Sequence, residues 1–233
     1  MTAAPAPGAR TRGDLVRTLV RGLGQTLITV GVVLLLFVVY TLWITNLFTA
    51  RDQAALDDQI TRQWEAPAAP GDVPGFGEAY ARIYIPAVGL GMDTRAVVVQ
   101  GVSVADLKRG AGHMPSTQAP GEVGNTVISG HRTTYGAPFA DLGELEVGDE
   151  VVLETRDSWF VYAVTGAEVV RPSAIEVTYP VPGQPGAVPT QRLLTLTTCN
   201  PKYSAKQRLV VRGELVSTVP KAGGQRPPAL ASV

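Results

Sequence analysis

A stretch without charged residues, from residue 22 to residue 50, is the feature that most limits how this chain can fold. Its apolar part, residues 27–47, is long enough to cross a bilayer, which takes about 20 apolar residues in a helix. Four arginines precede it, which predicts that the N-terminus stays in the cytoplasm and that the rest of the chain lies outside the cell. A cleaved signal peptide would have a shorter apolar core of about 7–15 residues. We therefore expect an uncleaved, single-pass membrane anchor.

The sequence on either side of this anchor divides the chain into five parts. We expect a basic cytoplasmic tail (1–22), the transmembrane anchor (23–48), a juxtamembrane segment with a Pro/Gly linker (49–78), an extracellular folded domain (79–219) and a disordered tail (220–233). The folded domain is long enough to have a hydrophobic core of its own.

The juxtamembrane segment begins with apolar residues at helical spacing. Leu56, Ile60 and Trp64 recur every four residues among charged side chains, which predicts a short helix. Prolines and glycines then follow too densely for regular structure.

The folded domain is expected to be mainly β. Its apolar residues alternate with polar ones, and many of them are β-branched, which is typical of strands. Seven strands with few helices favour a barrel or a sandwich over a parallel α/β sheet. Five prolines between residues 171 and 191 predict a long loop, and loops of that length are usually functional. We expect strands at 81–85, 94–100, 125–129, 150–155, 160–170, 192–197 and 208–216, and short helical pieces at 104–109 and 138–145.

Composition excludes several classes of function. The net charge is zero and no basic stripe is present, so the chain has no electrostatic footprint for nucleic acid. Two histidines and one cysteine show no ligand spacing for a metal. A glycine-rich loop of the kind that binds phosphates is also missing from the sequence. We expect no cofactor, no metal and no nucleic-acid partner.

The single cysteine, Cys199, is unusual for a domain outside the cell. Structural disulfides need an even number of cysteines, so Cys199 cannot belong to an intrachain framework. It could be a buried small hydrophobe, an intermolecular bridge or a reactive thiolate. Alternation along its strand places the thiol on the face opposite Leu194 and Leu196, and Asn200-Pro201 ends the strand. A side chain at a strand end beside a loop is accessible, which favours the reactive thiolate.

A cysteine nucleophile also requires a general acid/base. His113 and His131 compete for this role. His131 directly follows an apolar strand, as Cys199 completes one, whereas His113 lies in a predicted loop. This shared placement at strand ends favours His131. A solvated or loop-capping histidine is the alternative interpretation for both.

The third requirement is a donor that stabilises an oxyanion, and three arginines are candidates. Arg208 starts the next strand after Cys199, and a hairpin would bring it back beside the thiol. Arg212 lies on the same face but farther from the thiol, and Arg132 is the third candidate. For each of them the alternative is a solvated surface arginine.

These residues lie in motifs that resemble those of the sortases, membrane-anchored cysteine transpeptidases of Gram-positive bacteria. Residues 195–199 read TLTTC, which is similar to the family's Thr-Leu-x-Thr-Cys signature. Residues 125–132 read NTVISGHR, which resembles the family's histidine motif, and Arg208 corresponds to its arginine. The similarity covers most of residues 79–217. It implies a sortase-like eight-stranded β-barrel with short helices, in which the strand missing from our count would lie near residues 175–178.

The resemblance also implies a reaction. Cys199 would cleave a C-terminal Leu-Ala-x-Thr-Gly or Leu-Pro-x-Thr-Gly sorting signal of a secreted protein between Thr and Gly. The acyl group would pass through a thioester to an amine of a lipid-linked peptidoglycan precursor at the cell wall. His131 would act as the acid/base, and Arg208 with backbone groups near Thr198 would hold the oxyanion. Residues 131–136 and 198–204 resemble the class E sortases of high-GC actinobacteria, in which a substrate-pocket tyrosine is linked to the preference for Ala, and Tyr135 is one possibility for it.

Two alternatives to a transpeptidase remain. The domain could be a binding module with a structural cysteine, in which the proline-rich loop docks a partner. It could also be a thiol hydrolase that releases peptides and does not reattach them.

Overall fold

The computed structural model describes residues 12–40, 45–67, 74–91 and 94–231, and the chain forms two compact units, residues 1–44 and 45–233. In the first unit, α1 (Arg12–Val39) includes a span of 27 residues that is long and apolar enough to cross a membrane. Its apolar side chains are exposed, which is compatible with a single-pass anchor surrounded by lipid.

The bounds of this helix differ from the predicted anchor at 23–48. The helix begins at Arg12, inside the segment predicted as a cytoplasmic tail, because no proline separates the basic residues from the apolar ones. At the other end, residues 41–44 lie outside the described residues. Residues 45–48 belong to a second helix, α2 (Thr45–Glu65), in the other unit.

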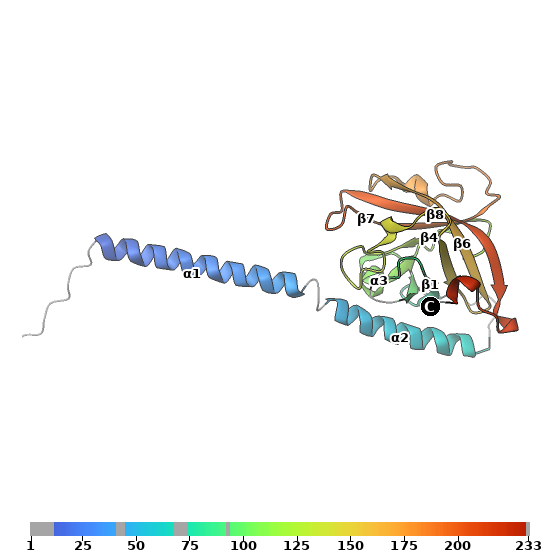
Figure 1. The fold of residues 1–233 in the computed structure, drawn as a ribbon, viewed down its shortest axis with the longest axis horizontal. Coiled ribbons are helices and arrows are strands. Elements are labelled where there is room, and N and C mark those ends of the chain that lie inside the picture. The colour runs from blue at the N-terminus through green and yellow to red at the C-terminus, as the bar shows by residue number, and fades with distance from the viewer. Residues whose placement is uncertain (1–11, 41–44, 68–73, 92–93, 232–233) are drawn as a thin grey trace, which may run out of the picture. The chain divides into compact units, whose positions relative to one another are not determined.

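The second unit contains a closed barrel of eight strands, in the order β1-β2-β3-β4-β7-β8-β6-β5. Figure 1 shows this barrel with α2 running along it. The pairs β2·β3 and β4·β7 are parallel, and the other neighbours in the barrel are antiparallel. The predicted mainly β barrel is therefore confirmed. The strands are β1 (Ala79–Tyr84), β2 (Arg95–Gln100), β3 (Ala111–His113), β4 (Gly124–Ser129), β5 (Glu150–Glu154), β6 (Ser158–Val170), β7 (Arg192–Asn200) and β8 (Gln207–Pro220), with α3 (Val104–Arg109) between β2 and β3.

The eighth strand is not where the sequence predicted it. Residues 175–178 form a short 3-10 helix, η3 (Ile175–Thr178), within the proline-rich loop. The missing strand is β3, which has three residues and pairs with both β2 and β4. A strand this short shows no alternation of apolar and polar residues, so its sequence resembled a loop.

The main hydrophobic core is formed by apolar side chains from one face of the strands. Ile83, Val98, Ile128, Leu194 and Leu196 are almost fully buried there. The long loop between β6 and β7 is fixed to this barrel through Asn125, a buried residue of β4. Its Nδ2 donates hydrogen bonds to the backbone oxygens of residues 177 and 179, each at 3.1 Å.

Helix α2 packs against the barrel with the apolar residues whose spacing predicted a helix. Leu56 and Ile60 are fully buried against β1 and β2, and Trp64 packs beside them. The opposite face is polar, as expected of an amphipathic helix on a protein surface. The predicted short helix is thus a helix of 21 residues.

The C-terminal segment was predicted to be disordered from residue 220, and the structure contradicts this up to residue 231. After β8 ends at Pro220, a 3-10 turn, η5 (Pro228–Leu230), follows. Leu230 is buried against Tyr84, Val152 and Trp159 on the outside of the barrel. Burial of this leucine offsets part of the chain entropy that is lost when the segment becomes ordered, although the composition by itself would favour disorder.

Candidate active site

Strand β7 carries Cys199 near its C-terminal end and lies between β4 and β8. The antiparallel pairing with β8 sets Arg208 directly opposite Cys199. The pairing with β4 is parallel, with Ser129 opposite Thr197, so both strands end at the same edge of the barrel. His131 follows the end of β4. The barrel therefore brings the cysteine, the histidine and the arginine to one edge.

Two hydrogen bonds join the strand ends that carry Cys199 and His131. The backbone N–H of Gly130 donates to the oxygen of Thr197 at 3.1 Å. In the opposite direction, the hydroxyl of Thr198 donates to the oxygen of Gly130 at 2.8 Å. Each bond connects a residue directly before His131 to a residue just before Cys199. The separation of the two side chains is thus set by backbone atoms that are themselves hydrogen-bonded.

Gly130 leaves room for an aromatic ring beneath the histidine. A Cβ atom at this position would lie 2.7 Å from the Phe139 ring, closer than any normal contact. Phe139 is buried, and its N–H donates to the oxygen of His131 at 3.1 Å. Because the backbones of Gly130 and His131 are both hydrogen-bonded, the backbone from which the imidazole extends is held in a fixed position.

His131 is half-buried between an aromatic ring and a positive charge. The Tyr135 ring centroid lies 5.0 Å from the imidazole centroid, with the planes tilted by 41°. Burial lowers the pKa of His131, and the positive charge of Lys108 lowers this pKa further. The neutral imidazole is therefore favoured at neutral pH, and the imidazolium form becomes more populated as the pH falls.

Arg132 takes a different place from the one considered in the sequence. Its Nη1 donates to the side-chain oxygen of Asn200 at 2.6 Å and to the backbone oxygen of Cys199 at 3.3 Å. These bonds connect Arg132, the residue after His131, to the end of β7. Arg132 therefore holds the backbone of Cys199 in place, and this bonding favours Arg208 over Arg132 as the candidate oxyanion donor.

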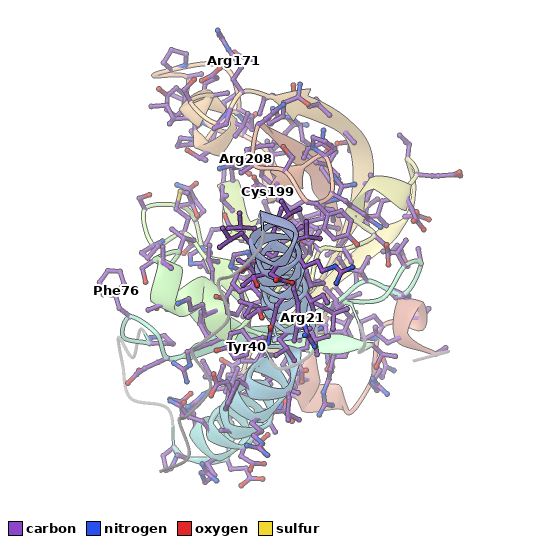
Figure 2. All side chains as sticks on the ribbon, turned by 90° about the vertical axis from the view of Figure 1, so that its left-hand side faces the viewer. Arg21, Tyr40, Phe76, Arg171, Cys199 and Arg208 are labelled. Carbon is purple, nitrogen blue, oxygen red and sulfur yellow. The ribbon has the colours of Figure 1, made fainter. Side chains whose placement is uncertain are left out.

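Cys199 and Arg208 lie side by side at this edge (Figure 2), and both are half-buried. The Arg208 Nη1 donates to the backbone oxygens of Ala205 and Gln207, at 3.1 and 3.0 Å. A guanidinium has five N–H donors, so these two bonds leave others that can reach an oxyanion. Arg212, opposite Thr195, is ion-paired with Glu168 and lies farther from the thiol.

His113 lies away from this edge as part of the protein interior. It belongs to β3, not to a loop, and only 2 % of it is exposed. Its Nδ1 is 2.8 Å from the Gln100 side-chain oxygen, and its Nε2 is 3.1 Å from the Gln118 oxygen. The ring also stacks on Tyr80 at 4.4 Å. Both ring nitrogens are thus engaged within the fold, which favours His131 as the acid/base.

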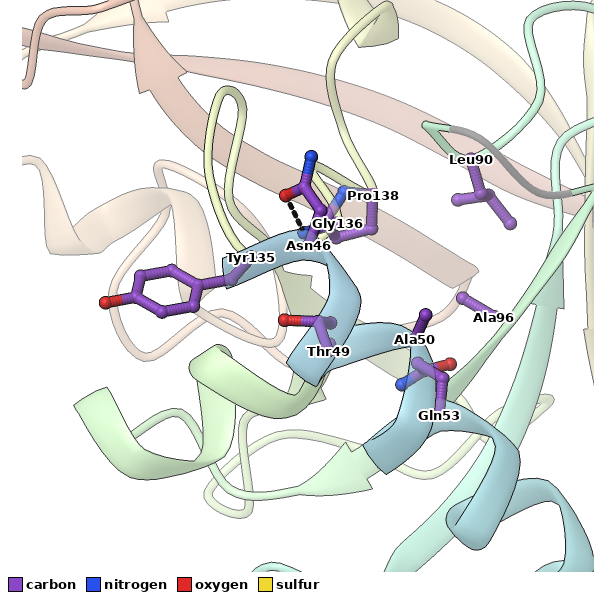
Figure 3. A pocket seen from close by; sticks show the side chains of 10 residues that line it. Asn46, Thr49, Ala50, Gln53, Leu90, Ala96, Tyr135, Gly136 and Pro138 are labelled. Carbon is purple, nitrogen blue, oxygen red and sulfur yellow. Dashed lines mark hydrogen bonds between the residues drawn. The ribbon is translucent and has the colours of Figure 1, made fainter. Parts of the chain in front are cut away.

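The two residues predicted to bind substrate differ in accessibility. The Thr198 side chain is buried and its hydroxyl donates to the Gly130 oxygen, so this side chain joins β7 to β4. Tyr135 is half-buried and lines a pocket between α2 and the loop after His131. In Figure 3 its ring extends away from Leu90 and Ala96 at the far side of that pocket.

Among the residues that the structure describes, no three His, Cys, Asp or Glu side chains are grouped as metal ligands. The three candidate groups at this edge are a thiol, an imidazole and a guanidinium. Together these groups supply a nucleophile, a proton donor and acceptor, and a fixed positive charge, which is the set that acyl transfer requires.

The family model of the sortase domain matches residues 83–216, which includes all three groups. Two curated relatives come from Streptomyces coelicolor. Sortase SrtE1 is 35% identical over 221 residues, covering 91% of this chain and 61% of the relative. Sortase SrtE2 is 34% identical over 238 residues, covering 95% of this chain and 91% of the relative. The chain thus spans less than two thirds of the length of SrtE1.

Solved structures show the same similarity. The SrtF sortase from Corynebacterium diphtheriae aligns with a TM-score of 0.65 and 32% identity, over 72% of this chain and 100% of that one. Sortase E from Streptomyces avermitilis gives a TM-score of 0.59 and 41% identity, over 67% and 99%. Sortase E1 from Streptomyces coelicolor, solved with a tripeptide in its active site, gives 0.60 and 37%, over 66% and 98%.

Proposed function

The chain belongs to the sortase family of cysteine transpeptidases, and on this basis we propose that Cys199 cleaves a sorting signal between Thr and Gly. The thiolate attacks the Thr carbonyl carbon and forms a tetrahedral oxyanion. The C–N bond then breaks, which leaves a thioester on Cys199 and a glycine amine that takes up a proton. An incoming amine attacks the thioester, the C–S bond breaks, and the thiolate is restored.

His131 and Arg208 carry the remaining steps of this proposal. His131 as imidazolium gives its proton to the departing amine and later accepts one from the incoming amine. Arg208 donates to the oxyanion. The observation that carries the proposal is the position of β7 between β4 and β8, which sets Cys199 opposite Arg208 and at the same barrel edge as His131.

The substrate we propose is a secreted protein with a C-terminal Leu-Ala-x-Thr-Gly or Leu-Pro-x-Thr-Gly signal. Similarity to the class E sortases of Streptomyces supports the Ala form. The acceptor would be the amine of a lipid-linked peptidoglycan precursor. The apolar helix α1 supports attachment to the membrane in which such a precursor lies, with the N-terminus in the cytoplasm and the barrel outside.

The test uses the full chain in detergent, the two signal peptides and triglycine as acceptor. We expect the peptide to be cleaved after Thr and, when triglycine is present, the amide product to replace the hydrolysis product. Cys199→Ala should remove both products. Hydrolysis that triglycine does not divert would favour a thiol hydrolase instead. Peptide binding without cleavage in the parent would favour a binding module.

The acid/base assignment is tested with the two histidines in the same assay. His131→Ala should abolish turnover because it removes the group proposed to transfer the proton. His113→Ala should keep most of the turnover per folded molecule, because its ring nitrogens are bonded inside the fold. An inactive His113→Ala enzyme beside an active His131→Ala enzyme would reverse the assignment.

A further inference from the structure

The loop after His131 contains a turn with unusual backbone geometry. Tyr135, Gly136 and Ala137 are consecutive and all have positive φ, of 52°, 75° and 45°. Residues with a side chain rarely adopt this region, and such conformations persist only where the surroundings hold them. The turn therefore depends on contacts from outside itself.

Those contacts come in part from the first turns of α2. The side-chain oxygen of Asn46 accepts a hydrogen bond from the N–H of Gly136 at 2.9 Å, as the dashed line in Figure 3 shows. Thr49 lies on the same face of α2, and a Cβ on Gly136 would lie 3.2 Å from its methyl group. Within the loop, Ala137 donates to the Thr134 oxygen at 3.0 Å. The middle of the turn is thus bonded to the helix, and one of its ends is bonded to the loop.

Both groups that surround His131 are connected to this part of α2. The Tyr135 ring lies 5.0 Å from the imidazole and belongs to the turn that Asn46 holds. The Lys108 Nζ lies 5.7 Å from the Tyr135 ring. The backbone oxygen of Lys108 accepts a hydrogen bond from the Thr49 hydroxyl at 3.0 Å.

We propose that Asn46 is a positioning residue for His131: it holds the turn at residues 135–137 so that the Tyr135 ring stays packed against the imidazole. This inference rests on the proposed role of His131 as acid/base. It makes the start of α2 a functional part of the site, although the helix contributes no reacting group.

Other residues of α2 bond the helix to the barrel. About two turns farther along than Asn46, Gln53 donates to the oxygens of Val97 and Arg109 and accepts from the Val97 N–H. Asp57 then bonds Arg82 and Arg95, at 2.6 and 2.8 Å. The bond from Asn46 goes to the turn beside His131.

The test compares the full chain in detergent with Asn46→Ala, using enzyme kinetics and NMR of the imidazole carbons. Because the chain has two histidines, His113 serves as an internal reference for His131. Loss of the acceptor should let the turn relax, so the His131 signal should shift and its pKa should rise toward 6.5 as the ring becomes more exposed. We expect kcat to fall about tenfold, the equivalent of 1.4 kcal/mol, with little change in KM.

Two further variants separate positioning from docking. Asn46→Asp keeps an oxygen acceptor for Gly136 and should retain kcat within about twofold of the parent. Gln53→Ala removes more bonds between α2 and the barrel but none to the turn, so it should lower Tm and leave His131 unshifted. An unshifted His131 signal in Asn46→Ala, or an equal shift in Gln53→Ala, would overturn the proposal. Because the NMR signals do not require turnover, failure of the proposed peptide chemistry would be recognised separately.

Discussion

The hydrogen bond from Thr198 to Gly130 provides the sharpest test of how this edge is built. It joins the residue before Cys199 to the residue before His131 at 2.8 Å, and both residues are buried. Thr198→Val keeps the branched shape of the side chain and removes the donor. We expect the variant to fold and to have a lower free energy of unfolding. We also expect it to be less active than the parent even when it is fully folded.

The magnitude follows from the burial of the partner. Removing the hydroxyl leaves the Gly130 oxygen without this donor in the interior, and such a loss costs about 1–3 kcal/mol. For a chain of this size a loss of about 2 kcal/mol lowers Tm by about 4–8 °C. If the strand ends separate by about 1 Å, kcat/KM should fall by up to about 100-fold.

The assay measures kcat/KM with a quenched Leu-Ala-x-Thr-Gly peptide and Tm by circular dichroism. Thr195→Val is the matched control, because Thr195 lies on the same strand, is fully buried and donates to the Asn125 side-chain oxygen at 2.8 Å. It should lower Tm comparably and keep kcat/KM near that of the parent. Equal kcat/KM in the two variants would refute the idea that the Thr198 bond sets the separation of the reacting groups.

Three other changes test the remaining parts of the site. Arg208→Ala should lower kcat about 100-fold or more, the size expected for one lost oxyanion donor, and unchanged kinetics would remove Arg208 from the site. Lys108→Gln should raise the pKa of His131, because it removes a charge that disfavours the imidazolium; NMR titration at low salt should detect the rise, which should be smaller at high salt. Gly130→Ala should cost about 1–3 kcal/mol by overpacking against Phe139, measured by chemical denaturation, and Phe139→Leu in the same chain should recover part of it.

Seven of the eight strands follow from alternation in the sequence, because a strand of five or more residues with one buried face shows the pattern clearly. The exception, β3, has three residues, and all of them are buried, so it carries no alternation. The same error placed His113 in a loop. The proximity of Arg208 to Cys199 could be predicted from the sequence, because the cysteine ends a strand, Asn-Pro follows it, and the next strand returns. The register of β7 and β8 places the two residues directly opposite each other.

The surroundings of these groups were less predictable. Arg132 follows His131 in the sequence, but nothing in the pattern indicates that its guanidinium bonds the Cys199 backbone. Thr198 was considered for the backbone groups near it, and nothing in the pattern indicates that its side chain is buried and bonded to Gly130. Side-chain direction near a strand end depends on the neighbouring strand and loop, which lie far away in the sequence.

The sequence by itself determined the apolar helix, the mainly β domain and the small set of groups able to perform chemistry, because these depend on composition and on short-range periodicity. Only the tertiary structure decided which groups share one edge. The parallel pairing of β4 with β7 joins segments separated by more than sixty residues, and the contact of Asn46 with Gly136 joins segments 90 residues apart. Such pairings are fixed by the closure of the barrel and by the burial of α2 against it, which depend on the whole chain and on no local pattern.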